Sequence, residues 1–203
     1  MAKLLVTPEH QIQRLNHILN TVSALRKMPA ATLTRAPHSK SWNVLEVLEH
    51  LSISLYLYTS KLKQAFSELP ESDSGSWSFK VRPWQRFVIE GQRPKGKKRP
   101  FKIKTLKRFE PLLTSEDLEH GDTIFERFLT SYRHLKQQIV SSRTRQMKHS
   151  PFSSAIGPIV KFYLPEAFEF LLCHAERHMV QIEEILDAQG VSLSLSGDRS
   201  GIL

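Results

Sequence analysis

Apolar residues recur every three or four positions in four long segments, which is the spacing of one face of an α-helix. Stretches rich in proline, glycine or serine separate these segments. The pattern predicts four amphipathic helices, which cover approximately residues 7–29, 41–69, 115–142 and 164–190.

Each segment opens with residues that favour a helix start. Thr7 and Ser115 are suited to cap a helix, and Pro8 and Pro165 suit its first turn, where no backbone donor is needed. Gly190 supplies a stop after the fourth segment. These signals set the expected helix boundaries.

The connections differ in length and composition. Residues 77–114 form a basic, proline-rich crossover that holds at most one short helix, from Trp84 to Glu90. Residues 143–162 are expected to be a loop, and residues 191–203 a flexible, serine-rich tail. No segment predicts a strand, and no domain boundary is visible. We therefore predict an all-α fold, a single four-helix-bundle domain over residues 1–203 with a long crossover between the second and third helices.

The bulk composition narrows the class of protein. The chain has 203 residues, of which 40% are apolar and 24% charged, as in globular domains. It has no apolar run of the roughly 20 residues that cross a bilayer, and no signal peptide is evident, so we expect a cytoplasmic protein without a membrane partner. Its single cysteine, Cys173, excludes an intrachain disulfide, and we interpret it as a small core residue.

Positive charge is concentrated in the crossover. The formal net charge is +9, yet residues 80–108 alone carry twelve lysines and arginines against one acid, Glu90. A solvated crossover explains this run, and so does a site for nucleic acid, another polyanion or an anionic substrate. The candidates for anion binding are Arg93, Lys95, Lys97, Lys98 and Arg99.

Three histidines form the chemically most specific pattern. His174 and His178 lie four residues apart, so a helix places them on one face. His50 lies at the edge of the apolar stripe of the second helix, displaced to the same side as the other pair. Three neutral imidazoles and one open position are typical of a catalytic site for a divalent metal such as zinc or nickel. Ala175 follows the first histidine, so the pattern is not the HExxH motif of zinc proteases.

Two stretches around these histidines resemble a known family. Residues 41–51 (SWNVLEVLEHL) are similar to the second-helix motif of the DinB superfamily, and residues 174–182 (HAERHMVQI) resemble its HxxxHxxQI motif. The resemblance implies a four-helix bundle, often a homodimer, with a divalent metal on His50, His174 and His178. Members with known activity include transferases and isomerases that use low-molecular-weight thiols.

Two neighbours of the histidines are expected to support them, Gln181 because of the resemblance and Glu46 because of its spacing. Gln181 belongs to the motif, and Glu46 lies one helical turn before His50, where it would orient the imidazole. We therefore expect a metal-dependent enzyme, a thiol-dependent transferase or a hydrolase acting on a small molecule. Two alternatives stay open: a binding module that uses its basic crossover for nucleic acid or another polyanion, and a family member that binds no metal and acts as an oligomerising scaffold.

Overall fold

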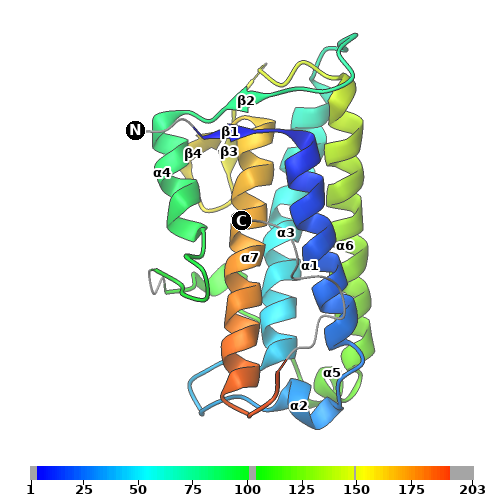
Figure 1. The fold of residues 1–203 in the computed structure, drawn as a ribbon, viewed down its shortest axis with the longest axis vertical. Helices are drawn as coiled ribbons and strands as arrows, with labels where there is room; N and C mark the ends of the chain where they lie inside the picture. Colours follow the sequence, from blue (N-terminus) through cyan, green and yellow to red (C-terminus); the bar gives the residue numbers. More distant parts are fainter. Residues whose placement is uncertain (1–3, 101–103, 149, 193–203) are drawn as a thin grey trace.

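The computed structural model describes residues 4–100, 104–148 and 150–192. Four long helices form a bundle: α1 (Pro8–Leu25), α3 (Val44–Ser67), α6 (Gly121–Ser141) and α7 (Leu164–Asp187) (Figure 1). Helices α1 and α3 each pack against both α6 and α7, so α1 and α3 occupy opposite corners. The predicted four-helix bundle is confirmed. Of the predicted tail, residues 193–203 lie outside the described residues.

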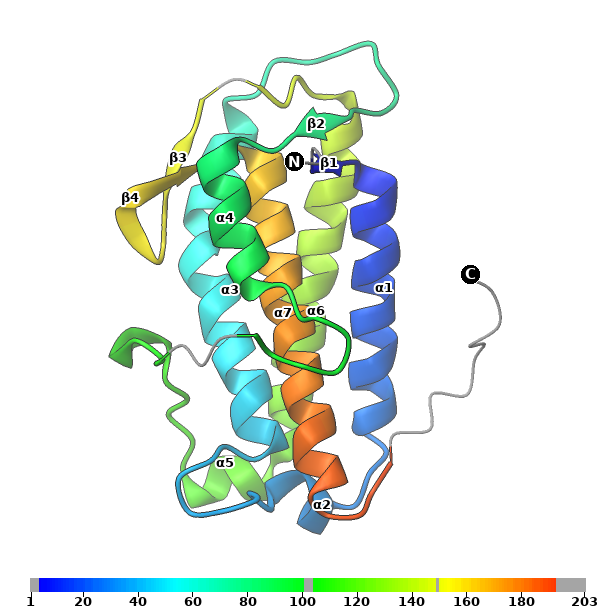
Figure 2. The same ribbon diagram turned by 60° about the vertical axis from the view of Figure 1, so that its left-hand side comes forward.

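The direction of the helices explains the long crossover. Helices α3 and α6 are neighbours that run the same way, whereas α1 and α7 run the opposite way (Figure 1). The chain therefore has to return along the whole length of α3, which is about 36 Å at 1.5 Å per residue, before α6 can begin. This connection contains β2 (Phe79–Lys80), α4 (Pro83–Gln92) and a 3-10 turn, η1 (Lys107–Phe109). Helix α4 confirms the short helix predicted there and packs along α7 (Figure 2).

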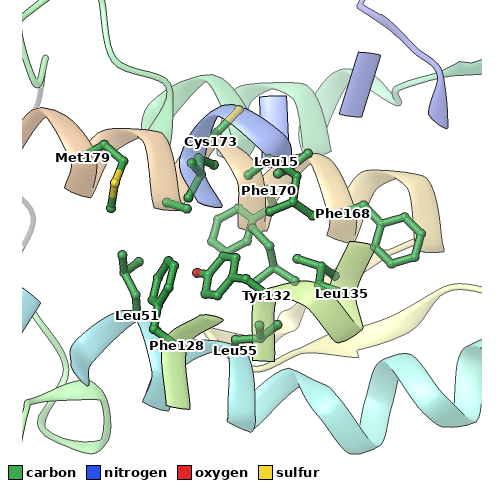
Figure 3. Close-up of a cluster of buried hydrophobic side chains, with 14 of the residues drawn as sticks. Leu15, Leu51, Leu55, Phe128, Tyr132, Leu135, Phe168, Phe170, Cys173 and Met179 are labelled. Carbon is green, nitrogen blue, oxygen red and sulfur yellow. The ribbon is translucent and has the colours of Figure 1, made fainter. Parts of the chain in front are cut away.

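Large apolar side chains from all four helices fill the bundle core. Leu15 of α1, Leu51 of α3, and Phe128 and Tyr132 of α6 are buried together with residues of α7 (Figure 3). The rings of Phe128 and Tyr132 stack with their centroids 4.2 Å apart. This core holds α3 and α7 side by side, and the histidines project from these two helices.

The third predicted helix is divided in two. Its cap is Thr114 rather than the predicted Ser115, because the Thr114 hydroxyl accepts from Asp117 N–H while the Asp117 carboxylate accepts from Thr114 N–H. Helix α5 (Ser115–Glu119) ends at His120, and α6 starts at Gly121. A Cβ atom at Gly121 would lie 3.1 Å from Leu45, so glycine allows the chain to approach α3 closely here.

The prediction that the chain has no strand was wrong. Strand β1 (Leu5–Val6) pairs antiparallel with β2, and β3 (Phe152–Ser154) pairs antiparallel with β4 (Gly157–Phe162) inside the expected loop 143–162. These strands are short, so their sequence shows no alternating pattern. Strand β3 packs against α3, and β4 packs against α4 and α7. The remaining elements are α2 (Ala30–Thr34) and a second 3-10 turn, η2 (Ser142–Thr144).

None of the helices in the described part of the chain combines the length and the apolar character needed to cross a bilayer.

Candidate metal centre

The fold brings the three predicted histidines together. His50 projects from α3, and His174 and His178 project from the facing side of α7. One ring nitrogen of each histidine lies within 4.8 Å of one ring nitrogen of the other two. The Nε2 atoms of His50 and His174 are 3.3 Å apart. The fold thus brings His50 together with two histidines that follow it by more than 120 positions, and the three form one cluster of ring nitrogens.

The outer ring nitrogens fix the tautomers of two of these histidines. His50 Nδ1–H donates to the carbonyl oxygen of Phe109 at 2.6 Å, and His178 Nδ1–H donates to the Gln181 side-chain oxygen at 2.9 Å. Both partners are oxygen acceptors, so both Nδ1 atoms carry the proton. The Nε2 atoms therefore keep their lone pairs, which is the state that a metal ligand requires.

Burial keeps the three imidazoles neutral. Desolvation lowers the pKa of His50, although the Phe109 carbonyl raises it. Desolvation, together with His50 and Arg177, lowers the pKa of His174 to about 3. Desolvation and the two neighbouring histidines lower the pKa of His178 well below its ordinary value. Neutral imidazole is the metal-binding form, so this donor set fits a divalent ion.

The histidines lie on the wall of a pocket of about 770 Å³. Trp42 closes one side, with its ring centroid 5.0 Å from that of His50 and 6.5 Å from that of His178. Farther along α3, Tyr58 and Ser154 share a hydrogen bond, and burial raises the pKa of Tyr58 to about 12, so its phenol stays protonated at neutral pH. The pocket is large enough for a small-molecule substrate beside the histidines.

The charged groups of the pocket are mostly positive. Lys40, Arg99, Lys104 and Arg177 line it, and Glu184 is the one carboxylate among its described lining residues. Glu184 is already engaged, because Arg99 donates to its two oxygens at 3.2 and 2.5 Å. The pocket therefore favours an anionic ligand over a cationic one.

Glu46 does not occupy the predicted place beside His50. Its carboxylate accepts from the backbone N–H of Asn43 at 2.8 Å, and the Asn43 side chain accepts from Glu46 N–H at 2.9 Å. This reciprocal pair is a capping box, which satisfies the first free amides of α3. The acceptor that orients His50 is instead the Phe109 carbonyl, at the end of the crossover.

Cys173 lies outside the histidine cluster, as its predicted core position requires. It is fully buried and faces α1 (Figure 3), where its sulfur lies 3.3 Å from Arg14 Nη2 and 3.6 Å from Glu169 Oε1. Burial and Glu169 raise the pKa of its thiol to about 12, so it is protonated at neutral pH. It is therefore neither a nucleophile nor a metal ligand here.

The five basic candidates of the crossover divide into two groups. Arg93 pairs with Glu90 and Glu169, and Arg99 pairs with Glu184, so both arginines attach the crossover to α7. The other three are exposed around a turn at Gly96, whose φ is +59°: Lys95, Lys97 and Lys98. Of the five candidates, two are therefore engaged by acidic partners and three are exposed.

Two residues of the site carried no usable signal in the sequence. Phe109 contributes a backbone carbonyl, which any residue type supplies, so only the fold reveals its role. Arg177 lies between two of the histidines in the sequence, but an arginine on a helix is ordinarily solvated. Its burial, with only 5% of the residue exposed, becomes visible only in the tertiary structure.

Comparison with known proteins identifies the family of the chain. The family model of the DinB superfamily matches residues 16–182. No curated protein was found to be similar to the chain. Among solved structures, the chain is similar to YfiT from Bacillus subtilis, described as a probable metal-dependent hydrolase with an unusual four-helix bundle topology. The two are 19% identical, the match covers 91% of this chain and 89% of YfiT, and the TM-score is 0.46. Because the family match spans most of its length, the chain belongs to the DinB superfamily.

Proposed function

We propose that this protein is a metal-dependent enzyme that binds one divalent ion through His50, His174 and His178. The observation that carries the proposal is the convergence of three neutral imidazoles on the wall of a pocket of about 770 Å³. One ring nitrogen of each imidazole lies within 4.8 Å of one ring nitrogen of the other two. Imidazole ligands suit zinc and nickel, and these are the metals we expect.

The protein's own residues prepare the site. Phe109 and Gln181 hold two imidazoles in the tautomer that leaves Nε2 free, and Trp42 shields them from solvent on one side. A divalent ion bound there would supply Lewis acidity, which polarises a substrate and eases the deprotonation of water or a thiol. Three protein ligands leave room for a further ligand from the pocket.

The described lining of the pocket offers no free carboxylate that could act as a general base. Within the described lining of the pocket, Glu184 is the one acid, and Arg99 occupies it. A bound divalent ion would then have to lower the pKa of its own water or thiol ligand, and this effect is available to both nucleophiles. Transfer to a low-molecular-weight thiol co-substrate and hydrolysis are therefore both candidate reactions, and assays of the metal-loaded protein with and without added thiol distinguish them. The homodimer expected from the family resemblance stays a prediction, which light scattering would test.

The decisive experiment is metal analysis of the purified protein without a histidine tag. Elemental mass spectrometry should find about one divalent ion per chain in the wild type. His50→Ala and the double variant His174→Ala/His178→Ala should lose it. His134→Ala, which changes an exposed histidine on α6, is the matched control and should keep it. If His50→Ala retained the full metal content, the assignment of ligands would be wrong.

A binding role for the crossover is the second candidate, and the exposed turn with Lys95, Lys97 and Lys98 supports it. Binding through phosphate contacts weakens steeply as salt increases, because counterions are released. An oligonucleotide that binds in a salt-dependent manner, and is lost when the three lysines are replaced by glutamine, would favour this role. Sensitivity of a turnover assay to a chelator would favour the enzyme.

A further inference from the structure

The pocket contains a buried guanidinium that forms no ion pair with any residue that the structure describes. Arg177 is 95% buried, since only 5% of its surface is exposed, and its Nη1 atom has no hydrogen-bond partner among the residues that the structure describes. No ion pair within 4.0 Å joins it to a described carboxylate. Burying a cation without a partner lowers the stability of the folded state, so the presence of an arginine at this position needs an explanation.

Two other arginines near α7, Arg14 and Arg82, form ion pairs with glutamates of that helix. Arg14 donates to both oxygens of Glu176, at 2.6 and 2.7 Å, and to Glu169. Arg82 makes a two-pronged contact with Glu166 at 3.0 and 2.6 Å. These arginines have their counter-charge inside the protein. Arg177 stands apart because none of its described neighbours pairs with it. Glu184, the carboxylate whose charge reaches it, is held by Arg99.

The position of Arg177 connects it to the histidines. It lies between His174 and His178 on α7, and it lines the same pocket. It is close enough to His174 for its charge to lower the pKa of that ring. On the facing helix α3, Ser54 follows His50 by one turn, lines the pocket, and has a buried hydroxyl with no partner among the described residues. Two unpaired polar groups thus face one cavity from two helices.

We propose that Arg177 is the anchor for an anionic group of the substrate, a carboxylate or a phosphate, with the Ser54 hydroxyl as a second donor. A planar guanidinium matches two oxygens of such a group, and the bound anion replaces the missing counter-charge. The inference rests on the proposed function, because it assigns a substrate class to the same site. It predicts that the substrate carries its charge close to the atom that reacts at the histidines.

The test uses the full-length protein, both as purified and after dialysis against a chelator. Sodium phosphate and sodium acetate serve as probes in thermal unfolding and titration calorimetry at low ionic strength. We compare the wild type with Arg177→Gln, Arg177→Lys and Arg133→Gln. The last variant removes the same charge from an exposed position on α6 and controls for net charge.

The wild type should bind at least one probe saturably, also without metal, and its Tm should rise with probe concentration. Arg177→Gln should bind at least tenfold more weakly, Arg177→Lys should retain part of the binding, and Arg133→Gln should match the wild type. Without any probe, Arg177→Gln should be more stable than the wild type, with a Tm higher by about 2 °C or more, because an uncompensated buried charge is removed. A preference for phosphate or for acetate tells the two chemistries apart.

Two results would overturn the proposal: no saturable response to either probe in the wild type, or an equal response in the wild type and Arg177→Gln. If Arg177→Gln fails to fold, Arg177→Lys, which keeps the charge but lacks the planar fork, replaces it in the comparison. Metal analysis of the same samples separates this inference from the proposed function. Loss of anion binding in Arg177→Gln at unchanged metal content supports the anchor, whereas a wild type that binds the anion but never a metal removes the metal site alone.

Discussion

His50 Nδ1 and the carbonyl oxygen of Phe109 lie 2.6 Å apart, although 59 positions separate them in the sequence. This hydrogen bond joins α3 to the end of the crossover. It determines which nitrogen of His50 faces the pocket. The crossover is therefore part of the candidate metal centre through its backbone, and its basic side chains are not the groups that make this contact.

The tautomers of the histidines can be observed directly. In ¹⁵N-labelled, metal-free protein at neutral pH, long-range ¹H–¹⁵N correlation spectra should show Nδ1 protonated and Nε2 unprotonated for His50 and His178. The reason is that each Nδ1–H faces an oxygen acceptor. Exposed His134 should show the usual mixture dominated by Nε2–H. The opposite tautomer at His50 would exclude the proposed ligand geometry.

Gln181 should contribute to metal affinity without being a ligand. In Gln181→Leu, His178 Nδ1–H loses its acceptor, so the ring is held less firmly and affinity should fall by about 10- to 100-fold. Gln181→Glu keeps an acceptor oxygen and should retain affinity. Competition with a chromogenic chelator measures the metal affinity of both variants. Gln137→Leu, on the exposed face of α6, is the control. Equal affinities in Gln181→Leu and the wild type would refute this role.

Glu46 should stabilise the helix rather than the metal centre. Glu46→Ala removes one half of the capping box, and Asn43→Ala removes the other half, so each should lower the free energy of unfolding by about 1 kcal/mol. Urea denaturation measures this loss. Metal content should stay at the wild-type level in both variants. A large loss of metal from Glu46→Ala, without a loss of stability, would restore the predicted role beside His50.

The buried acid Glu169 should make stability depend on pH. Burial raises the pKa of Glu169, but Arg14 and Arg93 lower it more, so its pKa lies below the usual value. Its stabilising contribution is then complete above the unfolded-state pKa of about 4.3 and is lost as the pH falls through the folded-state pKa. Glu169→Gln should cost about 3 kcal/mol at pH 7, because the partly buried Arg14 and Arg93 each lose one of their acidic partners. The difference from the wild type should shrink below roughly pH 4.

The control for Glu169 is an exposed ion pair. Glu126 is 54% exposed and pairs with Arg26, which is 34% exposed. Water and salt screen such pairs, so Glu126→Gln should change stability far less than Glu169→Gln does at pH 7. Urea denaturation at several pH values compares the two variants. A Glu169→Gln penalty that persists unchanged at low pH would mean that lost packing, and not lost charge, is responsible.

The sequence by itself determined the bundle and the three histidines that are its candidate ligands. The 3.6-residue repeat of apolar positions is a local property, so four helices and a long crossover follow from it. Proline and threonine at Pro8 and Thr7 mark the start of α1 for the same local reason. The spacing of His174 and His178 also fixes their common face, because both lie on one helix.

Only the tertiary structure decided what completes the site. The Phe109 carbonyl reaches His50 because the crossover returns along the bundle, and a backbone group has no sequence signature. Glu46 was expected to orient His50, yet the nearby free amides at the start of α3 take its carboxylate. Arg177 looks like any surface arginine until packing buries it. Hydrogen-bond partners and burial depend on which distant segments meet, and periodicity along the chain carries no information about that.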